Sequence, residues 1–263
     1  MLANSRRRSG APAESRQDTL YRPYRLASCA AGPTLFFRDD RLSDLIGFEY
    51  SKWHGRDAAA NFIGELEAIA AGTAGKATPV VSVILDGENA WEYYPYNGYY
   101  FLNDLYELLE RHPAIRTTTF SGTLGTRANS PAAGIEQLAA LAAGSWVYGS
   151  LSTWIGSPDK NRAWDFLCEA KVHFDRVIES GRLGEAQKAA AFGQLADCEA
   201  SDWFWWPGAY NPGQAVAAFE TLFRSKLAHL YRLLGLPVPA KLLVSFTHGS
   251  GDPELGGMMR RSS

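Results

Sequence analysis

Residues 80–92 read VVSVILDGENAWE, and the interpretation of the whole chain depends on this stretch. Its first part, Val80 to Leu85, is apolar and mostly β-branched with a single serine, which predicts a strand buried on both faces of a parallel sheet. Asp86 follows at once, and α/β barrels and doubly wound sheets place their catalytic groups at the carboxyl ends of such strands. Asp86 is therefore a candidate catalytic residue. The alternative is that residues 86–89 only cap the helix that comes next.

The overall composition excludes several classes of protein. With 263 residues the chain is long enough for one large α/β domain or two smaller ones, and its net charge of -2 gives no field that would recruit nucleic acid or a membrane surface. No apolar run approaches the ~20 residues of a membrane-spanning helix, and the N-terminus lacks the apolar core of a signal peptide. Three widely spaced cysteines, Cys29, Cys168 and Cys198, fit a reduced compartment and exclude a zinc motif by their spacing. We therefore expect a cytoplasmic protein with no metal, no nucleic acid and no membrane among its partners.

Four regions of the chain differ in composition. Residues 1–19 contain three consecutive arginines among small and polar residues and predict a disordered basic tail; three arginines are thin evidence for the alternative, a nucleic-acid-binding arm. Residues 20–131 predict a partial α/β barrel that carries the acidic motif, and residues 132–242 predict a helical domain, since their apolar residues recur at helical spacing. Residues 243–263 are predicted to form a C-terminal tail.

Within residues 20–131 the pattern predicts about three parallel strands joined by crossover helices. The predicted strands are residues 34–37, 80–85 and 115–120, and the predicted helices are residues 57–71 and 101–111. Three parallel strands are too few to close a barrel, so we expect an open part of one. The helices expected in the helical domain are residues 159–180, 183–197 and 214–234.

Aromatic side chains and one arginine add candidates for the site. The chain has 8 Trp, 12 Tyr and 13 Phe, and many of them gather in two clusters, one after Asp86 and one at residues 203–206. Core packing is the ordinary explanation for a single ring, but dense clusters beside prolines and glycines also suit a groove that stacks sugar rings. Arg38 follows the first predicted strand. Its simplest partner is Asp39 or Asp44 in a structural ion pair; the alternative is that it orients a catalytic carboxylate.

Four strings of residues, taken in order, resemble conserved segments of glycoside hydrolase family 57, of the amylopullulanase and α-amylase type. They are residues 37–48 with FRD, LSD and IGF, residues 85–98 with LDGENAWE and YP, residues 144–164 with GSW, STWIG and KNRAW, and residues 201–206 with SDWFWW. A single acidic tripeptide would be weak evidence, but four strings in the family's order are specific. The resemblance extends over about residues 20–240.

The resemblance implies a seven-stranded parallel barrel followed by a helical domain, and hence the C-terminal part of a (β/α)7 barrel in this chain. It also implies retaining cleavage of α-glucosidic bonds without a metal or an organic cofactor. The aspartate that matches Asp86 is the family's general acid/base. We expect an α-glucan or maltooligosaccharide as partner, with Arg38 and Asp39 in a supporting role. The residues expected to contact the sugar are Glu88, Trp91, Trp154, Trp203, Trp205 and Trp206.

Two departures from the family limit what is expected of the chain. The family's glutamate nucleophile and first barrel strands lie upstream of the segment that matches Tyr21, where this chain has only residues 1–20. Retaining cleavage needs a second carboxylate about 5 Å from the first, and the family does not use Glu88 for that purpose. We therefore expect a truncated chain that is incomplete alone and needs a separate upstream segment. After Trp206, residues 207–211 read PGAYN in place of the family's acidic, histidine-containing string.

Two other functions stay open on the sequence. The chain could be a non-catalytic glucan-binding module or a decayed remnant, in which Trp91, Trp154 and residues 203–206 stack sugars without cleavage. A purely structural or protein-interaction role would explain the apolar stripe of residues 214–234 but not the acidic strand end. An open barrel edge would in addition promote association of the isolated chain.

Overall fold

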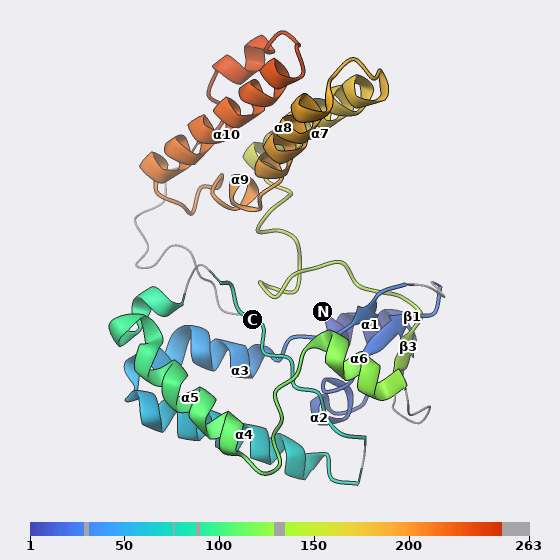
Figure 1. The fold of residues 1–263 in the computed structure, drawn as a ribbon, viewed down its shortest axis with the longest axis vertical. Helices are drawn as coiled ribbons and strands as arrows, with labels where there is room; N and C mark the ends of the chain where they lie inside the picture. The colour runs from blue at the N-terminus through green and yellow to red at the C-terminus, as the bar shows by residue number, and fades with distance from the viewer. Residues whose placement is uncertain (29–31, 76, 88–89, 129–134, 249–263) are drawn as a thin grey trace. The chain divides into compact units, whose positions relative to one another are not determined.

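A computed structural model describes the placement of residues 1–28, 32–75, 77–87, 90–128 and 135–248. The chain divides into two compact units, one formed by Met1–Ser150 and one that begins at Leu151 (Figure 1). This division lies beyond residue 132, where the composition changes. The reason is that strand β3 (Glu136–Leu138) pairs with strand β1 (Tyr24–Leu26) and so belongs to the first unit.

The first unit holds a sheet of three short strands. β1 (Tyr24–Leu26) pairs in parallel with β3 and antiparallel with β2 (Thr34–Leu35), so the strand order is β2-β1-β3. Tyr24 is fully buried, and its hydroxyl donates to the carbonyl oxygen of Thr19 over 2.6 Å. The ring of Phe37 meets the ring of Tyr24 edge to face, with 5.5 Å between the ring centres. Tyr24 therefore anchors the sheet in the core of the first unit.

Residues 80–85, predicted as a parallel strand, have no regular secondary structure and belong to no strand ladder. The amide of Val80 donates to the carbonyl oxygen of Tyr21 over 2.9 Å, and the carbonyl oxygen of Ser82 accepts from the amide of Asp39 over 2.8 Å. These bonds go to two different segments, and one bond to each is too few for a ladder. Val81, Val83 and Leu85 still pack against the core of the first unit, which explains why the sequence resembles a buried strand.

The other two predicted strands also differ from the structure. Residues 115–119 have no regular secondary structure, and helix α6 (Phe120–Ala128) begins directly after them. Their threonines favour an extended backbone, but none of the strands in the described part of the chain pairs with them. Of residues 34–37 only Thr34–Leu35 form a strand, and it runs antiparallel to β1. The prediction of three parallel strands is therefore wrong for these residues, and the fold is mixed α/β and mostly helical.

Two long helices of the first unit match the predicted crossover helices. α4 (Gly55–Gly72) and α5 (Tyr99–Arg111) lie side by side (Figure 1). α4 buries Phe62 and α5 buries Phe101. The helices approach closely at Gly55, where a Cβ would lie 3.0 Å from the amide nitrogen of Phe101. The absence of a side chain at this glycine is thus part of how the two helices pack.

Residues 1–19 form two short helices instead of the predicted disordered tail. These are α1 (Leu2–Arg8) and α2 (Arg16–Thr19). Arg6 is buried, and its Nη1 donates to Glu136 Oε1 over 2.5 Å. An acid far along the chain thus neutralises one charge of the arginine run. Composition could not reveal this pairing, because it depends on the tertiary fold.

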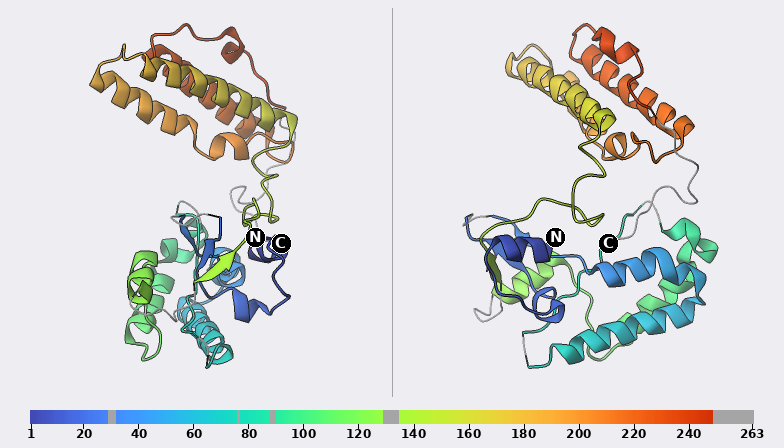
Figure 2. Two further views of the ribbon diagram at one scale, coloured as in Figure 1. Left: turned by 90° about the vertical axis from the view of Figure 1, so that its right-hand side faces the viewer. Right: turned by 180° about the vertical axis from the view of Figure 1, so that it is seen from behind.

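The second unit is built from three long helices that lie side by side, α7 (Pro158–Glu179), α8 (Glu185–Cys198) and α10 (Gly213–Leu233) (Figure 2). They coincide with the three helices that the apolar spacing predicts, and the short helix α9 (Asp202–Trp205) lies between α8 and α10 in the sequence. One core joins all four helices, and its buried aromatic members are Phe166, Phe174, Trp203, Phe204, Phe223 and Tyr231. Within the described ranges, none of the helices of either unit combines the length and apolar character needed to cross a membrane.

The segment after α10 is tied back to that helix by one carboxylate. Glu220 is 2 % exposed. It accepts hydrogen bonds from the hydroxyls of Ser245 and Thr247 over 2.6 and 2.7 Å. The amide of Phe246 and Nε of Arg224 also donate to Glu220 Oε1, over 2.9 and 2.8 Å. We call Glu220 and these four donors the Glu220 latch.

Candidate active site

Asp86 comes directly after the apolar segment of residues 80–85 and is half-buried. It lines a small pocket of about 40 Å³ in the first unit, which we call the Asp86 pocket. The other residues that line it are Arg38, Ser43, Gly47, Phe48, Ile84, Leu85 and Trp146. This volume holds a few water molecules but not a sugar ring. The pocket is therefore the immediate surrounding of the carboxylate and not a complete sugar-binding site.

Arg38 forms the structural ion pair that the sequence predicts, and its partner is Asp44. Nη2 of Arg38 lies 2.9 Å from Asp44 Oδ1. The guanidinium also lies over the ring of Trp146, with 4.9 Å between Cζ and the ring centre. Trp146 was not among the predicted site residues. Its place in the GSW string gave a signal for the family, but the sequence contained nothing to show that Trp146 and Arg38 meet.

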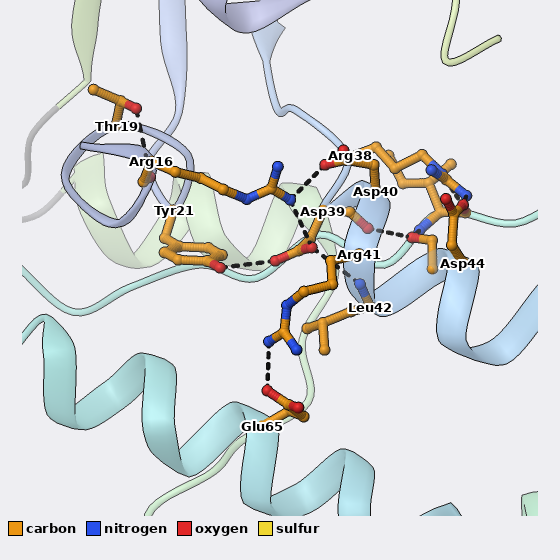
Figure 3. Close-up of polar contacts among 12 residues, drawn as sticks. Arg16, Thr19, Tyr21, Arg38, Asp39, Asp40, Arg41, Leu42, Asp44 and Glu65 are labelled. Atoms are coloured by element: carbon orange, nitrogen blue, oxygen red, sulfur yellow. Dashed lines mark hydrogen bonds and ion pairs between the residues drawn. The ribbon is translucent and has the colours of Figure 1, made fainter. Parts of the chain in front are cut away.

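Asp39, the other residue expected to support the site, is fully buried and caps helix α3 (Asp40–Asp44). Its Oδ1 accepts from the amide of Leu42 over 3.0 Å and pairs with Arg16 over 2.9 Å. Its Oδ2 accepts from the hydroxyl of Tyr21 over 2.8 Å (Figure 3). Burial and the neighbouring Asp39 carboxylate raise the pKa of Tyr21. Asp39 therefore holds the start of α3 in place, and it does not line the Asp86 pocket.

Two further ion pairs attach α3 to neighbouring segments. Arg16 pairs with Asp40, and Arg41 pairs with Glu65 of α4 (Figure 3). Burial opposes ionisation of Asp40, but the guanidinium of Arg16 outweighs it and lowers the pKa of that carboxyl. The hydrogen bond from Arg41 lowers the pKa of Glu65. These pairs fix α3 against the rest of the unit, and none of the four side chains lines the Asp86 pocket.

The remainder of the acidic motif has a packing role where the structure describes it. Glu88 lies outside the described residues, so its sugar contact stays a prediction. Trp91 is half-buried, and its ring packs against Tyr94, with 5.5 Å between ring centres. It also covers Gly98, whose φ of 78° favours glycine and where a Cβ would lie 2.9 Å from the Trp91 ring. Tyr94 is buried, donates its hydroxyl to the carbonyl oxygen of Ile46, and has its pKa raised by burial.

Trp203 is a core residue of the second unit and not an exposed sugar platform. It is 6 % exposed, and its ring stacks on Phe223 with 5.8 Å between ring centres. Its Nε1 donates to the carbonyl oxygen of Asp197 over 2.6 Å. The predicted sugar contact of Trp203 is therefore wrong, because its ring faces are buried within the unit. The prediction treated residues 203–206 as one cluster because they are adjacent in the sequence. Successive side chains of a helical turn point to different sides, so these residues do not share the same surroundings.

The other tryptophans predicted to bind sugar are half-buried in the second unit. Trp206 stacks on Phe219 with 4.4 Å between ring centres, and Trp205 meets Trp206 edge to face at 5.1 Å. The carbonyl oxygen of Trp154 accepts from Nε1 of Trp164 over 2.9 Å. Trp154 is also packed against the core of the second unit, so each of the three residues has packing contacts as well as exposed area. Their contact with sugar stays a prediction.

A buried lysine holds the end of helix α9 at Trp205 together with Trp206 after it, and we call these two residues the tryptophan loop. Lys160 is 1 % exposed, and its Nζ donates to the carbonyl oxygen of Phe204 over 2.8 Å and to the hydroxyl of Tyr210 over 2.6 Å. Nδ2 of Asn211 donates to the carbonyl oxygen of Trp206 over 2.8 Å. Tyr210 and Asn211 belong to the PGAYN string that departs from the family pattern. In this chain that string therefore has a structural role, since it holds backbone carbonyls of the tryptophan loop.

A larger cavity lies in the second unit between α7 and α8 and has a volume of about 420 Å³. Phe174, Phe192 and Leu195 line it together with acidic side chains. None of the predicted site residues lines this cavity. Among the residues that the structure describes, no group of three or more histidines, cysteines, aspartates or glutamates is placed to hold a metal ion.

Comparisons with known proteins match residues of the first unit to one family. Residues 5–132 match the model of glycosyl hydrolase family 57. No curated protein matches the chain. The chain is similar in structure to a family 57 branching enzyme from the hyperthermophilic archaeon Thermococcus kodakaraensis, crystallised with glucose and additives, with a TM-score of 0.66 and 16% identity. That match covers 86% of this chain and 49% of the enzyme.

A second solved structure gives the same result. It is a branching enzyme of the family 57 type from the hyperthermophilic archaeon Pyrococcus horikoshii, with a TM-score of 0.56, 18% identity, and coverage of 95% of this chain and 57% of the enzyme. The chain thus spans about half the length of these two enzymes, and at this identity the likeness shows the fold alone. The match of residues 5–132 to the family model is more specific evidence than these two structural likenesses. The match of residues 5–132, which carry both Arg38 and Asp86, supports a family 57 fragment in this chain.

Proposed function

We propose that the chain acts on α-glucans and that Asp86 is the general acid/base of a retaining mechanism. The observation that carries the proposal is the position of Asp86, which lines a pocket beside Arg38 in the residues that match family 57. The acid of such a mechanism first gives its proton to the glycosidic oxygen and then takes one from water. A half-buried aspartate beside a water-sized pocket is suited to both steps.

Retaining cleavage requires a second carboxylate about 5 Å from the first, as the nucleophile. Among the described residues that line the Asp86 pocket, Asp86 is the only carboxylate. We therefore propose that the nucleophile comes from residues other than those described in the lining of this pocket. In the same proposal, residues 20–131 are the C-terminal part of a (β/α)7 barrel.

The proposed substrate is an α-glucan or maltooligosaccharide, with Trp91, Trp154, Trp205 and Trp206 as stacking residues. Rings of this kind bind the apolar faces of sugars. The sequence strings favour an amylopullulanase-like hydrolase, whereas both solved neighbours are named as branching enzymes. Hydrolysis and glucan transfer are therefore both included in the proposal. A cytoplasmic location stays a prediction from the sequence.

The experiment compares the chain with two matched aspartate variants. Purified chain is incubated with maltoheptaose and with amylose, and reducing ends and new branch points are measured over time. Asp86→Asn is expected to lower turnover by about 100-fold or more, because amides do not transfer the required proton. Asp57→Asn, which changes an exposed aspartate on α4, serves as the control and should keep full activity. Equal activity of the two variants would contradict the role of Asp86.

A second candidate function is glucan binding without turnover. It is favoured by the single carboxylate of the Asp86 pocket, since one carboxylate cannot serve as both acid and nucleophile. Calorimetric titration of the chain with maltoheptaose tests it. Binding that persists in Asp86→Asn, with no product from the wild-type chain, supports a binding module. Product formation by the wild-type chain alone excludes it.

A further inference from the structure

Arg38 joins the backbone before Asp86 to two other parts of the first unit. Its Nε donates to the carbonyl oxygen of Ile84 over 2.8 Å, while Nη2 donates to Asp44 Oδ1 over 2.9 Å. The guanidinium face lies over the Trp146 ring at 4.9 Å. The Arg38 side chain is only 12 % exposed. We call Arg38 and these three partners the Arg38 clamp.

The contacts of the clamp depend on the shape of the guanidinium as well as on its charge. Nε and Nη2 donate from one edge of a rigid planar group, so their acceptors on Ile84 and Asp44 are held at a fixed separation. The flat face of the same group covers Trp146. Lysine has a compact ammonium on a flexible stem, with neither a planar fork nor a flat face. It could keep the charge of Arg38 but not all three contacts.

The contact with Ile84 fixes the backbone two residues before Asp86. The amide of Ile84 donates to Ser43 Oγ over 3.2 Å, so both backbone polar groups of Ile84 are held by side chains. Residues 80–85 have no strand ladder to hold them. The side chains of Arg38 and Ser43 therefore supply restraints that a ladder supplies in an ordinary strand.

We propose that Arg38 is a positioning residue: it holds the backbone that carries Asp86 at a fixed distance from Trp146, and it does so through its planar guanidinium. The positional part of this proposal concerns the folded chain alone. Its catalytic part rests on the proposed function, since a correctly placed acid matters only if Asp86 transfers a proton. Displacement of a reacting group by about 1 Å costs about 100-fold in rate.

The test uses three variants of the full chain. Arg38→Lys keeps the charge but removes the fork, and Arg38→Ala opens a space that methylguanidinium can enter. Arg41→Lys is the matched control, because Arg41 lies three residues after Arg38 in the chain but pairs with Glu65 and does not line the Asp86 pocket. Amide hydrogen exchange is followed by mass spectrometry in peptides that span residues 80–86, and kcat and KM are measured with maltoheptaose.

Arg38→Lys is expected to raise exchange in residues 80–86 and to lower kcat by about 100-fold, with KM within about threefold of the wild type. Methylguanidinium should restore both readouts in Arg38→Ala but not in Arg38→Lys, where the space is filled. The control should match the wild type. The proposal is overturned if Arg38→Lys leaves exchange and kcat unchanged, or if methylguanidinium restores neither readout in Arg38→Ala.

The two readouts separate this proposal from the proposed function. If the wild-type chain gives no product, the proposed function fails for the chain alone. Hydrogen exchange and its rescue by methylguanidinium then still decide whether Arg38 positions residues 80–86. If the chain is active and exchange rises in Arg38→Lys while kcat does not fall, Arg38 is a structural residue only.

Discussion

The Asp86 pocket and the Glu220 latch each combine a carboxylate with an arginine, yet the two carboxylates have different surroundings. Glu220 is 2 % exposed, and four donors converge on its two oxygens. Asp86 is half-buried and opens on a pocket, and its neighbour Arg38 binds Asp44 and a backbone carbonyl. A carboxylate surrounded by donors contributes to stability, whereas one that faces a pocket beside a restrained backbone suits proton transfer.

Replacing the latch carboxylate should have the largest effect on stability. Glu220→Ala removes the acceptor of Arg224, Ser245 and Thr247 and leaves the arginine charge without its partner, which costs about 3 kcal/mol of unfolding free energy. Chemical denaturation followed by circular dichroism measures this change. If the free energy of unfolding fell by less than about 0.5 kcal/mol, the latch would contribute no more than a surface ion pair to stability.

A side chain added at Gly144, in the loop that carries Trp146, should have the next largest effect on stability. A Cβ at Gly144 would overlap the carbonyl oxygen of Gly149, so Gly144→Ala must shift the loop at a cost of about 1–3 kcal/mol. Because this loop places Trp146 beneath Arg38, turnover should fall as well. Gly125→Ala, where no atom lies within 4 Å of the added methyl group, is the control for both readouts.

Acid should weaken the latch in a defined pH range. Burial opposes ionisation of Glu220, but the hydrogen bonds from Ser245, Thr247, Phe246 and Arg224 outweigh it and lower the pKa. A carboxyl with a lowered folded-state pKa stabilises the protein fully above its unfolded value of about 4.3 and loses that contribution as the pH falls through the folded value. Unfolding free energy should therefore fall below about pH 4 in the wild type and less steeply in Glu220→Gln. Parallel pH profiles of the two proteins would contradict this assignment.

The smallest effect on stability is expected for an ion pair on the surface. Arg41 pairs with Glu65, and their side chains are 50% and 25% exposed. Exposed pairs of this kind contribute about 0–1 kcal/mol, so Arg41→Ala should change unfolding free energy by about 0.5 kcal/mol at most. A thermal denaturation series with Arg38→Ala compares the surface pair with the buried clamp. An equal loss in both variants would mean that the clamp is no stronger than a surface pair.

The helices could be predicted from the sequence because their core faces repeat every few residues along one segment. The apolar spacing in residues 159–180 and 214–234 is a local property, and α7 and α10 formed where it indicated. Strands depend on a partner elsewhere in the chain. Residues 80–85 have the composition of a buried strand but only single bonds to neighbouring segments, whereas β1 and β3 are three residues long and too short to show an alternating pattern.

The site was predictable in part for the same reason. Asp86 and Arg38 belong to strings whose residues lie together in the sequence, and the structure places both at one pocket. Trp146 and Lys160 belong to such strings too, but their contacts with Arg38 and Tyr210 depend on tertiary packing. The buried state of Trp203 is a third example, because hydrophobicity alone does not distinguish a core ring from a ring that binds sugar.

The most direct test of the central claim, that Asp86 is a proton donor, varies the leaving group. An acid matters for a sugar leaving group, which needs protonation, but little for a 2-chloro-4-nitrophenolate, which leaves without it. Asp86→Asn should lower kcat/KM, which reports the acid-assisted first step, about 100-fold or more on maltoheptaose and less than about tenfold on 2-chloro-4-nitrophenyl α-maltotrioside. Equal losses on the two substrates, or no loss on either, would contradict the assignment of Asp86 as the general acid.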